Sequence, residues 1–245
     1  YEDYNFDGIK DFAIMDGFNS CYGGPSFKIF LASDKEFIYN DAFTDLAQNY
    51  CGMFVVDNKN RLISTMEKSG CCLHYYSDFI VENNNPKLIR TRTDDCLKAP
   101  ICTTTIEEWK GEKKTKTVTS TIDLDSEIIS DYFKFHVDKE NKDIILCNFY
   151  DDRLCYVILD AKQNVEFYYP FEELRQTSDF IFYRKNGKLT FKNKDASYTI
   201  YDKSGKIGVD ITYKGKTHQW KGNAKSRRGS IGKLLKGSLD NVVYQ

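Results

Sequence analysis

The residues with the clearest chemical potential lie at the start of the sequence, where oxygen-bearing side chains recur at alternate positions. They form the pattern D-x-N-x-D-G-x-x-D, in which a glycine lets the chain turn sharply. Calcium takes about six to eight oxygen ligands, and loops of this kind supply them from alternate side chains and one backbone carbonyl. No bidentate Glu follows at the twelfth position, so the loop is not a complete EF-hand. The pattern predicts Ca2+ bound by Asp3, Asn5, Asp7, Ile9 and Asp11; the alternative is an acidic turn that binds nothing.

A second set of reactive residues is Cys71, Cys72 and His74, which together suggest a thiol nucleophile with a base. Neighbouring residues of a strand point to opposite faces, and a cysteine engaged in a disulfide is not a nucleophile. The sequence also lacks G-x-S-x-G, H-E-x-x-H, a Walker loop and G-x-G-x-x-G. We therefore expect no enzymatic activity, and a thiol hydrolase is the least favoured hypothesis.

The eight cysteines are an even number, and their spacing does not suit zinc because no C-x2-C occurs. Cys96 and Cys102 bracket a short proline-containing loop that a disulfide would close. Cys147 and Cys155 flank the turn Asp151-Asp152 between two apolar strands, and cross-strand neighbours near a hairpin turn can come close enough to form a bridge. The remaining cysteines pair by a scheme that the sequence leaves open: Cys21, Cys51, Cys71 and Cys72. Free buried thiols are the alternative.

Disulfides and calcium both point to an oxidising compartment, for which the periplasm is our expectation. An export signal would then precede Tyr1. The sequence has no apolar run of about 18 residues, so we expect no membrane span. The 17 Tyr and 17 Phe, the four Pro and a net charge of −1 fit a folded, β-rich protein rather than a disordered one.

The strands and turns predict an all-β fold of antiparallel sheets in two packed β modules, with one or two short helices. We place a calcium-loop module at 1–93, a polar, Thr-rich connection at 94–127, a meander module at 128–222 and a basic tail at 223–245. Alternation over Lys116–Ile122 would also suit an edge hairpin. Asp41–Asn49 is the one expected helix, because Phe43, Leu46 and Ala47 fall on one face.

The expected strands are runs of β-branched and aromatic residues separated by Asn, Asp, Gly and Pro. In the first module they are Phe12–Met15, Phe27–Leu31, Met53–Asp57, Arg61–Met66, Cys72–Val81 and Leu88–Thr93. In the second they are Tyr132–Val137, Ile144–Phe149, Leu154–Leu159, Val165–Tyr169, Phe180–Arg184, Lys188–Lys192, Ser197–Tyr201 and Gly208–Tyr213.

Charge is distributed unevenly along the chain. Residues 1–50 hold 9 acidic and 3 basic side chains, whereas residues 203–245 hold 10 basic and 2 acidic ones. The basic tail Lys225–Lys236 could attract nucleic acid or anionic lipid. We favour a solvated extension, or a helix packed on the protein through Ile231, Leu234 and Leu235, and expect no nucleic-acid partner.

Several segments together resemble a bacterial periplasmic immunity family. They are the opening calcium pattern, which is similar to the loops of FG-GAP-type β-repeats, then Cys21–Phe27 (CYGGPSF), then Ser69–Tyr75 (SGCCLHY) ahead of Pro86-Lys87-Leu88. The resemblance covers roughly residues 1–93. Members resemble lysozyme inhibitors and neutralise peptidoglycan-cleaving toxins that type IV or type VI secretion systems deliver.

The resemblance implies an immunity protein that binds a cognate antibacterial effector protein, a cell-wall hydrolase, and occludes its active site. Inhibitors of this kind often carry an S-G-x-x-Y loop; here Ser69-Gly70 is followed by the next Tyr only at position 75. We therefore predict a partner-binding segment at Ser69, Gly70, His74 and Tyr75, or, alternatively, an ordinary turn and strand. The alternative function is a calcium-dependent carbohydrate- or surface-binding protein, for which Trp109 and Trp220 would supply sugar-binding rings.

Overall fold

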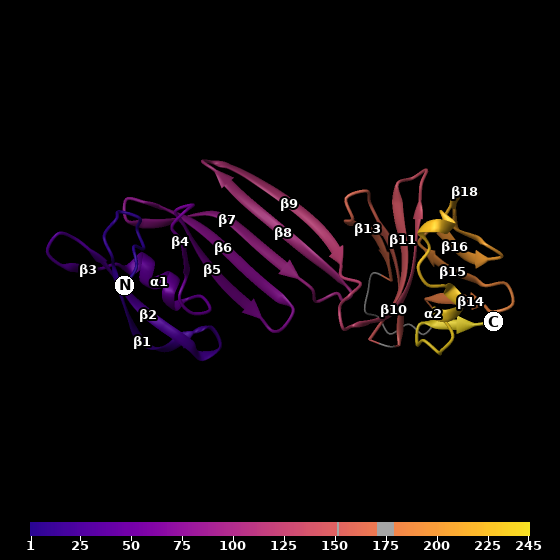
Figure 1. Cartoon of the computed structure of the whole chain (residues 1–245), viewed down its shortest axis with the longest axis horizontal. Helices are drawn as coiled ribbons and strands as arrows, with labels where there is room; N and C mark the ends of the chain where they lie inside the picture. Colours follow the sequence, from indigo (N-terminus) through magenta and orange to yellow (C-terminus); the bar gives the residue numbers. More distant parts are fainter. Residues whose placement is uncertain (151, 171–178) are drawn as a thin grey trace. The chain divides into compact units, whose positions relative to one another are not determined.

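The computed structural model describes residues 1–150, 152–170 and 179–245, and these are mostly β-strands (Figure 1). The all-β expectation is confirmed, with two short α-helices in this part of the chain. Contacts between residues divide the chain into two units: residues 1–97 with 103–119, and residues 98–102 with 120–245. In the described ranges, no helix has the length and apolar character needed to cross a membrane.

Unit 1 begins with a three-stranded antiparallel sheet in the order β1 (Phe12–Ser20), β2 (Gly24–Ala32) and β3 (Phe37–Tyr39). The turn η1 (Cys21–Gly23) joins β1 to β2. Helix α1 (Asp41–Gln48) follows, and the side chain of Asn40 caps it by accepting a hydrogen bond from the Phe43 amide at 3.0 Å. The predicted helix is thus confirmed, and its predicted apolar face is buried: Phe43, Leu46 and Ala47.

The second sheet of unit 1 has six antiparallel strands in sequence order. They are β4 (Val55–Asp57), β5 (Leu62–Ser69), β6 (Leu73–Glu82), β7 (Asn85–Asp95), β8 (Ile101–Lys110) and β9 (Lys113–Ile122). Buried side chains of this sheet, such as Ile63 and Phe79, share one core with α1, β2 and the N-terminal loop. The polar stretch at 94–127 was predicted to be a connection, but it forms the two strands β8 and β9 of this sheet. Strand β9 lies at the sheet edge. Threonine-rich alternation suits such exposed strands because Thr is β-branched.

Unit 2 contains two sheets. The first has the order β10 (Ile129–Val137), β11 (Lys142–Phe149), β12 (Arg153–Leu159) and β13 (Val165–Tyr169). The second contains β14 (Phe180–Tyr183), β15 (Lys188–Asn193), β16 (Ala196–Lys203), β17 (Lys206–Tyr213) and β18 (Lys216–Lys221). Residues 151 and 171–178 of the predicted 128–222 module lie outside the described residues. Strand β11 is buried on both faces: Ile144 and Leu146 belong to one core cluster, and Ile145 and Cys147 to another.

The C-terminal segment is part of the unit 2 core. After η2 (Ala224–Ser226), helix α2 (Ile231–Leu234) packs its apolar side chains into the main core cluster of this unit. Strand β19 (Val242–Tyr244) then pairs in parallel with β14 and completes a six-stranded sheet. Of the alternatives for the basic tail, the packed helix is the one observed, and Ile231, Leu234 and Leu235 are the buried residues, as predicted. The parallel pair departs from the all-antiparallel meander that the sequence suggested.

Candidate functional site

The β5–β6 hairpin contains the segment predicted to bind a partner. Its last paired residues are Ser69 and Leu73, so Gly70, Cys71 and Cys72 form the tip. Gly70 has a φ of 68°, a backbone conformation that glycine adopts without steric cost. Ser69, the last residue of β5, and the tip residues Gly70 and Cys71 are exposed, and Cys72 is half-buried. The hairpin therefore presents a short, solvent-accessible tip.

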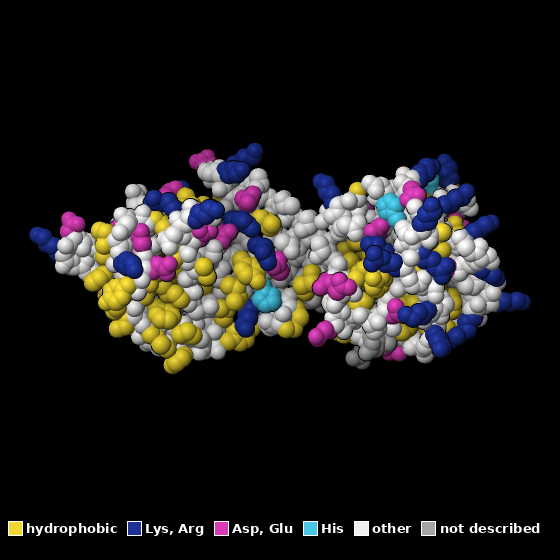
Figure 2. Space-filling model, in the orientation of Figure 1, with side chains coloured by type: hydrophobic (Ala, Val, Ile, Leu, Met, Phe, Trp, Pro, Cys, Tyr) yellow, Lys and Arg dark blue, Asp and Glu magenta, His cyan; other side chains and the backbone are white. Residues whose placement is uncertain are grey.

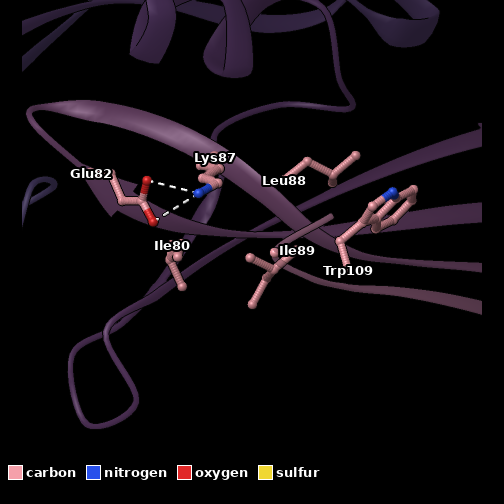
Figure 3. Close-up of a pocket in the computed structure, with 7 residues that line it drawn as sticks. Ile80, Glu82, Lys87, Leu88, Ile89 and Trp109 are labelled. Carbon is pink, nitrogen blue, oxygen red and sulfur yellow. Dashed lines mark hydrogen bonds and ion pairs between the residues drawn. The ribbon is translucent and has the colours of Figure 1, made fainter. Parts of the chain in front are cut away.

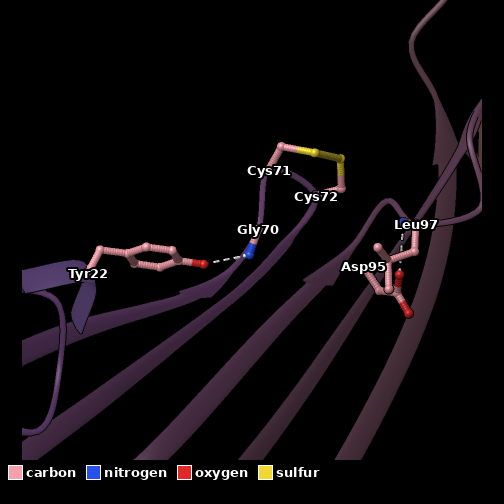
Figure 4. The surroundings of a disulfide bond; sticks show 6 residues. All are labelled: Tyr22, Gly70, Cys71, Cys72, Asp95 and Leu97. Atoms are coloured by element: carbon pink, nitrogen blue, oxygen red, sulfur yellow. Dashed lines mark hydrogen bonds between the residues drawn. A yellow bond between two sulfur atoms is a disulfide. The ribbon is translucent and has the colours of Figure 1, made fainter.

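A disulfide joins the adjacent residues Cys71 and Cys72 within this tip (Figure 4). Most disulfides stabilise a fold by removing loop entropy from the unfolded chain. Two adjacent cysteines are already close in the unfolded chain, so this bond removes little of that entropy. Its effect is local: it restricts the conformations that the tip itself can adopt.

Tyr22 braces the tip from a distant part of the sequence. Its hydroxyl accepts a hydrogen bond from the Gly70 amide at 2.7 Å (Figure 4), and the Lys68 ammonium lies 5.0 Å from the centre of its ring. The Tyr22 side chain is nevertheless 68% exposed. Its turn is anchored by the disulfide between Cys21 and Cys51. Tyr22 lies in the run Cys21–Phe27, which carried part of the family resemblance, but nothing in the sequence indicated that Tyr22 reaches Gly70.

A third contact supports the tip from the end of β7. The Cys72 carbonyl accepts a hydrogen bond from the Cys96 amide at 2.8 Å. Cys96 is itself disulfide-bonded, as is Cys102. The carboxylate of Asp95 accepts from the Leu97 amide at 3.0 Å and orders the chain beside it (Figure 4). The backbone on both sides of the tip is therefore held by covalent or hydrogen-bonded partners.

His74 and Tyr75 lie just below the tip, on opposite faces of the hairpin. His74 is paired with Lys68 on β5 and with Asp94 on β7, and it is half-buried. Tyr75 points the other way and is 37% exposed. The structure thus places Ser69 and Gly70 together at the tip and separates His74 from Tyr75. A partner that closes over one face of the hairpin would contact only one of these two side chains.

The face that carries His74 continues as an ordered array of charged and aromatic groups. The Arg92 guanidinium lies 4.6 Å from the centre of the Tyr76 ring and donates to the carboxylate of Asp94, with Nε 3.1 Å from Oδ1. The Thr104 hydroxyl donates to the same oxygen at 2.9 Å. The hydrogen bond from Arg92 holds the pKa of Asp94 below its usual value, against the opposing effect of burial. We did not predict this array, although the alternation Arg-x-Arg-x-Asp in β7 could have indicated it.

Figure 2 shows how the surface of unit 1 differs from strand to strand. Side chains of both charges gather over β6–β8, whereas hydrophobic side chains gather over β1 and β2. The exposed apolar residues of the first sheet include Phe18, Phe37 and Tyr39. The ring of Phe30, in the centre of this sheet, lies 5.5 Å from that of Tyr39. Unit 1 therefore offers one polar, paired surface and one apolar surface.

The N-terminal loop folds around its own acidic side chains. The Asp3 carboxylate accepts hydrogen bonds from the amides of Asp7 and Gly8, at 3.0 and 2.8 Å. The Asn5 side-chain oxygen accepts from the Asp7 amide at 3.2 Å, and the Asp7 carboxylate accepts from the Ile9 amide at 2.7 Å. Four of the five predicted calcium ligands therefore lie in one compact loop, and all can offer oxygen.

Asp11, the fifth predicted ligand, has a different environment. It is buried and accepts hydrogen bonds from the amides of Tyr4 at 2.7 Å, Asn5 at 3.4 Å and Ala32 at 2.8 Å. Burial raises the pKa of this carboxyl group, and the three backbone hydrogen bonds oppose the change. In the ranges that the structure describes, no three Asp, Glu, His or Cys side chains converge closely enough to hold a metal ion. The oxygen donors suit calcium chemically, while Asp11 connects the loop to β2.

The predicted bridge between Cys147 and Cys155 is not formed. The two residues are paired in register across β11 and β12, as expected, but both are free, buried thiols. Residues directly opposite in an antiparallel pair have Cβ atoms about 4.5–5.5 Å apart, whereas a disulfide needs about 3.5–4.5 Å. The interaction with Cys155, together with burial, raises the pKa of Cys147 well above its usual value. A buried thiol with a raised pKa stays protonated, so it contributes to core packing and is a poor nucleophile.

Comparisons with known proteins add one partial likeness. No protein-family model matches the chain, and no curated protein matches it. A solved structure described as "Structure of a Xanthomonas Type IV Secretion System related protein" is similar, with 26% sequence identity and a TM-score of 0.43. The similarity covers 47% of this chain and 55% of that one, so the chain spans about half the length of the structure it matches. At this TM-score the likeness in fold is only partial.

Proposed function

We propose that this chain is an immunity protein that binds a cognate secreted antibacterial toxin, a cell-wall hydrolase, and blocks its active site. The observation that carries the proposal is the β5–β6 tip, which is exposed yet held by three separate restraints. They are the Cys71–Cys72 disulfide, the hydrogen bond from Gly70 to Tyr22, and the hydrogen bond from Cys96 to Cys72. The protein acts by occlusion and carries out no chemistry of its own.

Preorganisation is what makes such a tip suitable for inhibition. A loop that is already ordered loses little conformational entropy when it enters a cleft, so more of the contact energy appears as affinity. Inhibitory interfaces also depend on a few aromatic or arginine anchors at their centre. Tyr22 and Tyr75 are exposed aromatic side chains beside the tip, the first hydrogen-bonded to Gly70 and the second on β6. They are the anchors we expect to matter most.

The disulfides support an oxidising compartment for this function. The bonds Cys21–Cys51 and Cys71–Cys72 would be reduced in most cytosols. A periplasmic protein would meet a wall-degrading toxin at the site where that toxin acts. This location is part of the proposal.

We also propose that the N-terminal loop binds Ca2+, with Asp3, Asn5 and Asp7 as side-chain donors and Ile9 as the carbonyl donor. The support is that two carboxylates and one amide oxygen are already gathered in a single loop, which Tyr4 and Phe6 anchor in the core. Bound calcium would add metal coordination to a loop otherwise held by hydrogen bonds from backbone amides to Asp3, Asn5 and Asp7, and would thereby stabilise unit 1. Calcium titration followed by calorimetry tests this part; no heat of binding would contradict it.

The test of the inhibitory function uses a secreted cell-wall hydrolase encoded next to the gene for this chain, and the absence of any such neighbouring gene would count against the proposal. We expect a stable 1:1 complex and loss of hydrolase activity on isolated peptidoglycan. Tyr22→Ala and Tyr75→Ala should each weaken the complex by about 2 kcal/mol, or roughly 30-fold in Kd. Tyr213→Ala in unit 2, which removes a similarly exposed tyrosine, is the matched control and should have no effect.

His74→Ala completes this design because His74 and Tyr75 occupy opposite faces of the hairpin. If only one of these two variants weakens the complex, the toxin covers the face on which that side chain lies. If neither does, and the toxin is still inhibited, the β5–β6 tip is not the inhibitory element. If the toxin is not bound at all, the immunity function itself is refuted for this pair.

A further inference from the structure

A cavity of about 440 Å³ opens on unit 1, at the ends of β6 to β8 away from the hairpin tip (Figure 3). Ligand sites in proteins typically have volumes of about 300–1,000 Å³. The lining combines aliphatic side chains, one indole ring and one ion pair: Ile80, Leu88, Ile89, Trp109, Glu82 and Lys87. This composition suits a small ligand that has both an apolar face and polar edges.

Trp109 is held in place from outside the cavity. The Lys114 ammonium lies 4.9 Å from the centre of the indole ring and is itself paired with Glu107 at 2.9 Å. Lys114 is not part of the cavity lining. A cation over one face of the ring is attracted by the π electrons and favours this orientation of the indole. The ring therefore has a defined partner outside the cavity.

The polar edge of the cavity is electrically balanced. The Lys87 ammonium lies 3.0 and 2.9 Å from the two carboxylate oxygens of Glu82, and both side chains are about half exposed. An anionic ligand would meet Glu82 and a cationic ligand would meet Lys87, so neither is favoured. A neutral group rich in hydroxyls can donate to Glu82 and accept from Lys87 while leaving their ion pair in place.

We infer that the cavity beside Trp109 binds one or two pyranose rings of a neutral oligosaccharide. The apolar C–H face of the sugar would pack on the indole, whose π face is electron-rich, and the ring hydroxyls would hydrogen-bond to Glu82 and Lys87. The aliphatic side chains of Ile80 and Ile89 would form the floor. This site is separate in sequence and position from the β5–β6 tip, and it does not depend on the proposed inhibitory function.

The test measures sugar binding to the full chain by calorimetry and by Trp fluorescence. The probes are three neutral trisaccharides: β-1,4-linked N-acetylglucosamine trimer, cellotriose and maltotriose. They are used at up to about 10 mM, because an open site of this size should have a Kd near the millimolar range. We expect at least one probe to bind. Trp109→Ala should then weaken binding about 10-fold or more, and Trp109→Phe should retain part of it.

Two further variants separate the sugar contacts from general damage to the sheet. Lys87→Met and Glu82→Gln each remove one polar partner at exposed positions and should weaken binding several-fold without changing Tm. Trp220→Phe, in unit 2, should leave sugar binding unchanged. The inference is overturned if none of the three probes binds, or if a probe binds equally well to the wild-type chain and to Trp109→Ala.

Discussion

The disulfides of unit 1 allow a sharp test of the distinction between a bond that stabilises the fold and one that shapes a binding element. Cys21–Cys51 spans 30 residues of sequence, whereas Cys71–Cys72 spans one. The entropy of loop closure predicts about 3.7 kcal/mol of stabilisation for the longer bond and about 1 kcal/mol or less for the bond between neighbours. The double variants Cys21→Ala/Cys51→Ala and Cys71→Ala/Cys72→Ala should therefore differ greatly in stability.

Guanidinium denaturation measures this difference. Trp109 lies in unit 1 and Trp220 in unit 2, so fluorescence in a Trp220→Phe background follows unit 1 alone. We expect the free energy of unfolding of unit 1 to fall by about 3–4 kcal/mol in the Cys21/Cys51 variant and by about 1 kcal/mol in the Cys71/Cys72 variant. Replacement by alanine also removes two sulfur atoms from each site, so the difference between the variants is the decisive quantity.

Toxin inhibition provides the second half of this test. The Cys71/Cys72 variant should remain folded and yet lose affinity, because its tip must become ordered at the moment of binding. Immobilising a few residues costs about 1–2 kcal/mol each, so a loss of 10-fold or more in Kd is expected. Equal losses of stability in the two variants would refute the entropic reasoning. Full affinity in the Cys71/Cys72 variant would show that tip rigidity is not required.

Three further outcomes are expected. Chelation with EDTA should lower Tm, because calcium at a hundredfold excess over its Kd stabilises the folded state by about 2.7 kcal/mol. Asp7→Ala should lower Tm in the same way, and Asp34→Ala should not. Identical melting curves with and without EDTA would exclude calcium binding. Asp143, a buried residue of β11, is hydrogen-bonded to the side chains of Lys134, His136 and Gln163 at 2.8, 2.7 and 3.1 Å. Burial alone would raise the pKa of Asp143, but these hydrogen bonds outweigh it and lower the pKa, so Asp143→Asn should cost about 1–3 kcal/mol at pH 7. A carboxyl group whose pKa is lower in the folded state stabilises the fold above its unfolded-state pKa. The difference in free energy of unfolding between wild type and Asp143→Asn, measured by denaturation at several pH values, should therefore shrink as the pH falls below about 4 and through the folded-state pKa. A difference that does not change with pH would contradict this. Thiol titration should detect two free thiols in denaturant and none in the native protein, because Cys147 and Cys155 are buried; any other count would contradict the cysteine assignment.

Local patterns were sufficient to predict most of the secondary structure. Runs of β-branched and aromatic residues predicted many of the strands, but not β3, β8, β18 or β19. The spacing of Phe43, Leu46 and Ala47 predicted helix α1. The register of Cys147 opposite Cys155 also followed from two apolar runs joined by a short turn. For this pair of cysteines, only the predicted disulfide bond was wrong, because the Cβ–Cβ distances that allow a disulfide span only about an ångström. Periodicity specifies which residues face each other, but it does not specify distances at that scale.

Contacts between distant segments were decided by the tertiary structure alone. On a regular strand Cys71 and Cys72 would point to opposite faces, and only the turn after Gly70 lets them bond to each other. Tyr22 reaches Gly70 across 48 residues, and β19 pairs with β14 in parallel although the rest of its sheet is antiparallel. Hydrogen-bond propensities and side-chain alternation act over a few residues, whereas these contacts depend on how whole strands pack. The sequence by itself therefore determined the all-β class and the candidate tip, and the packing of unit 1 determined that the tip is braced.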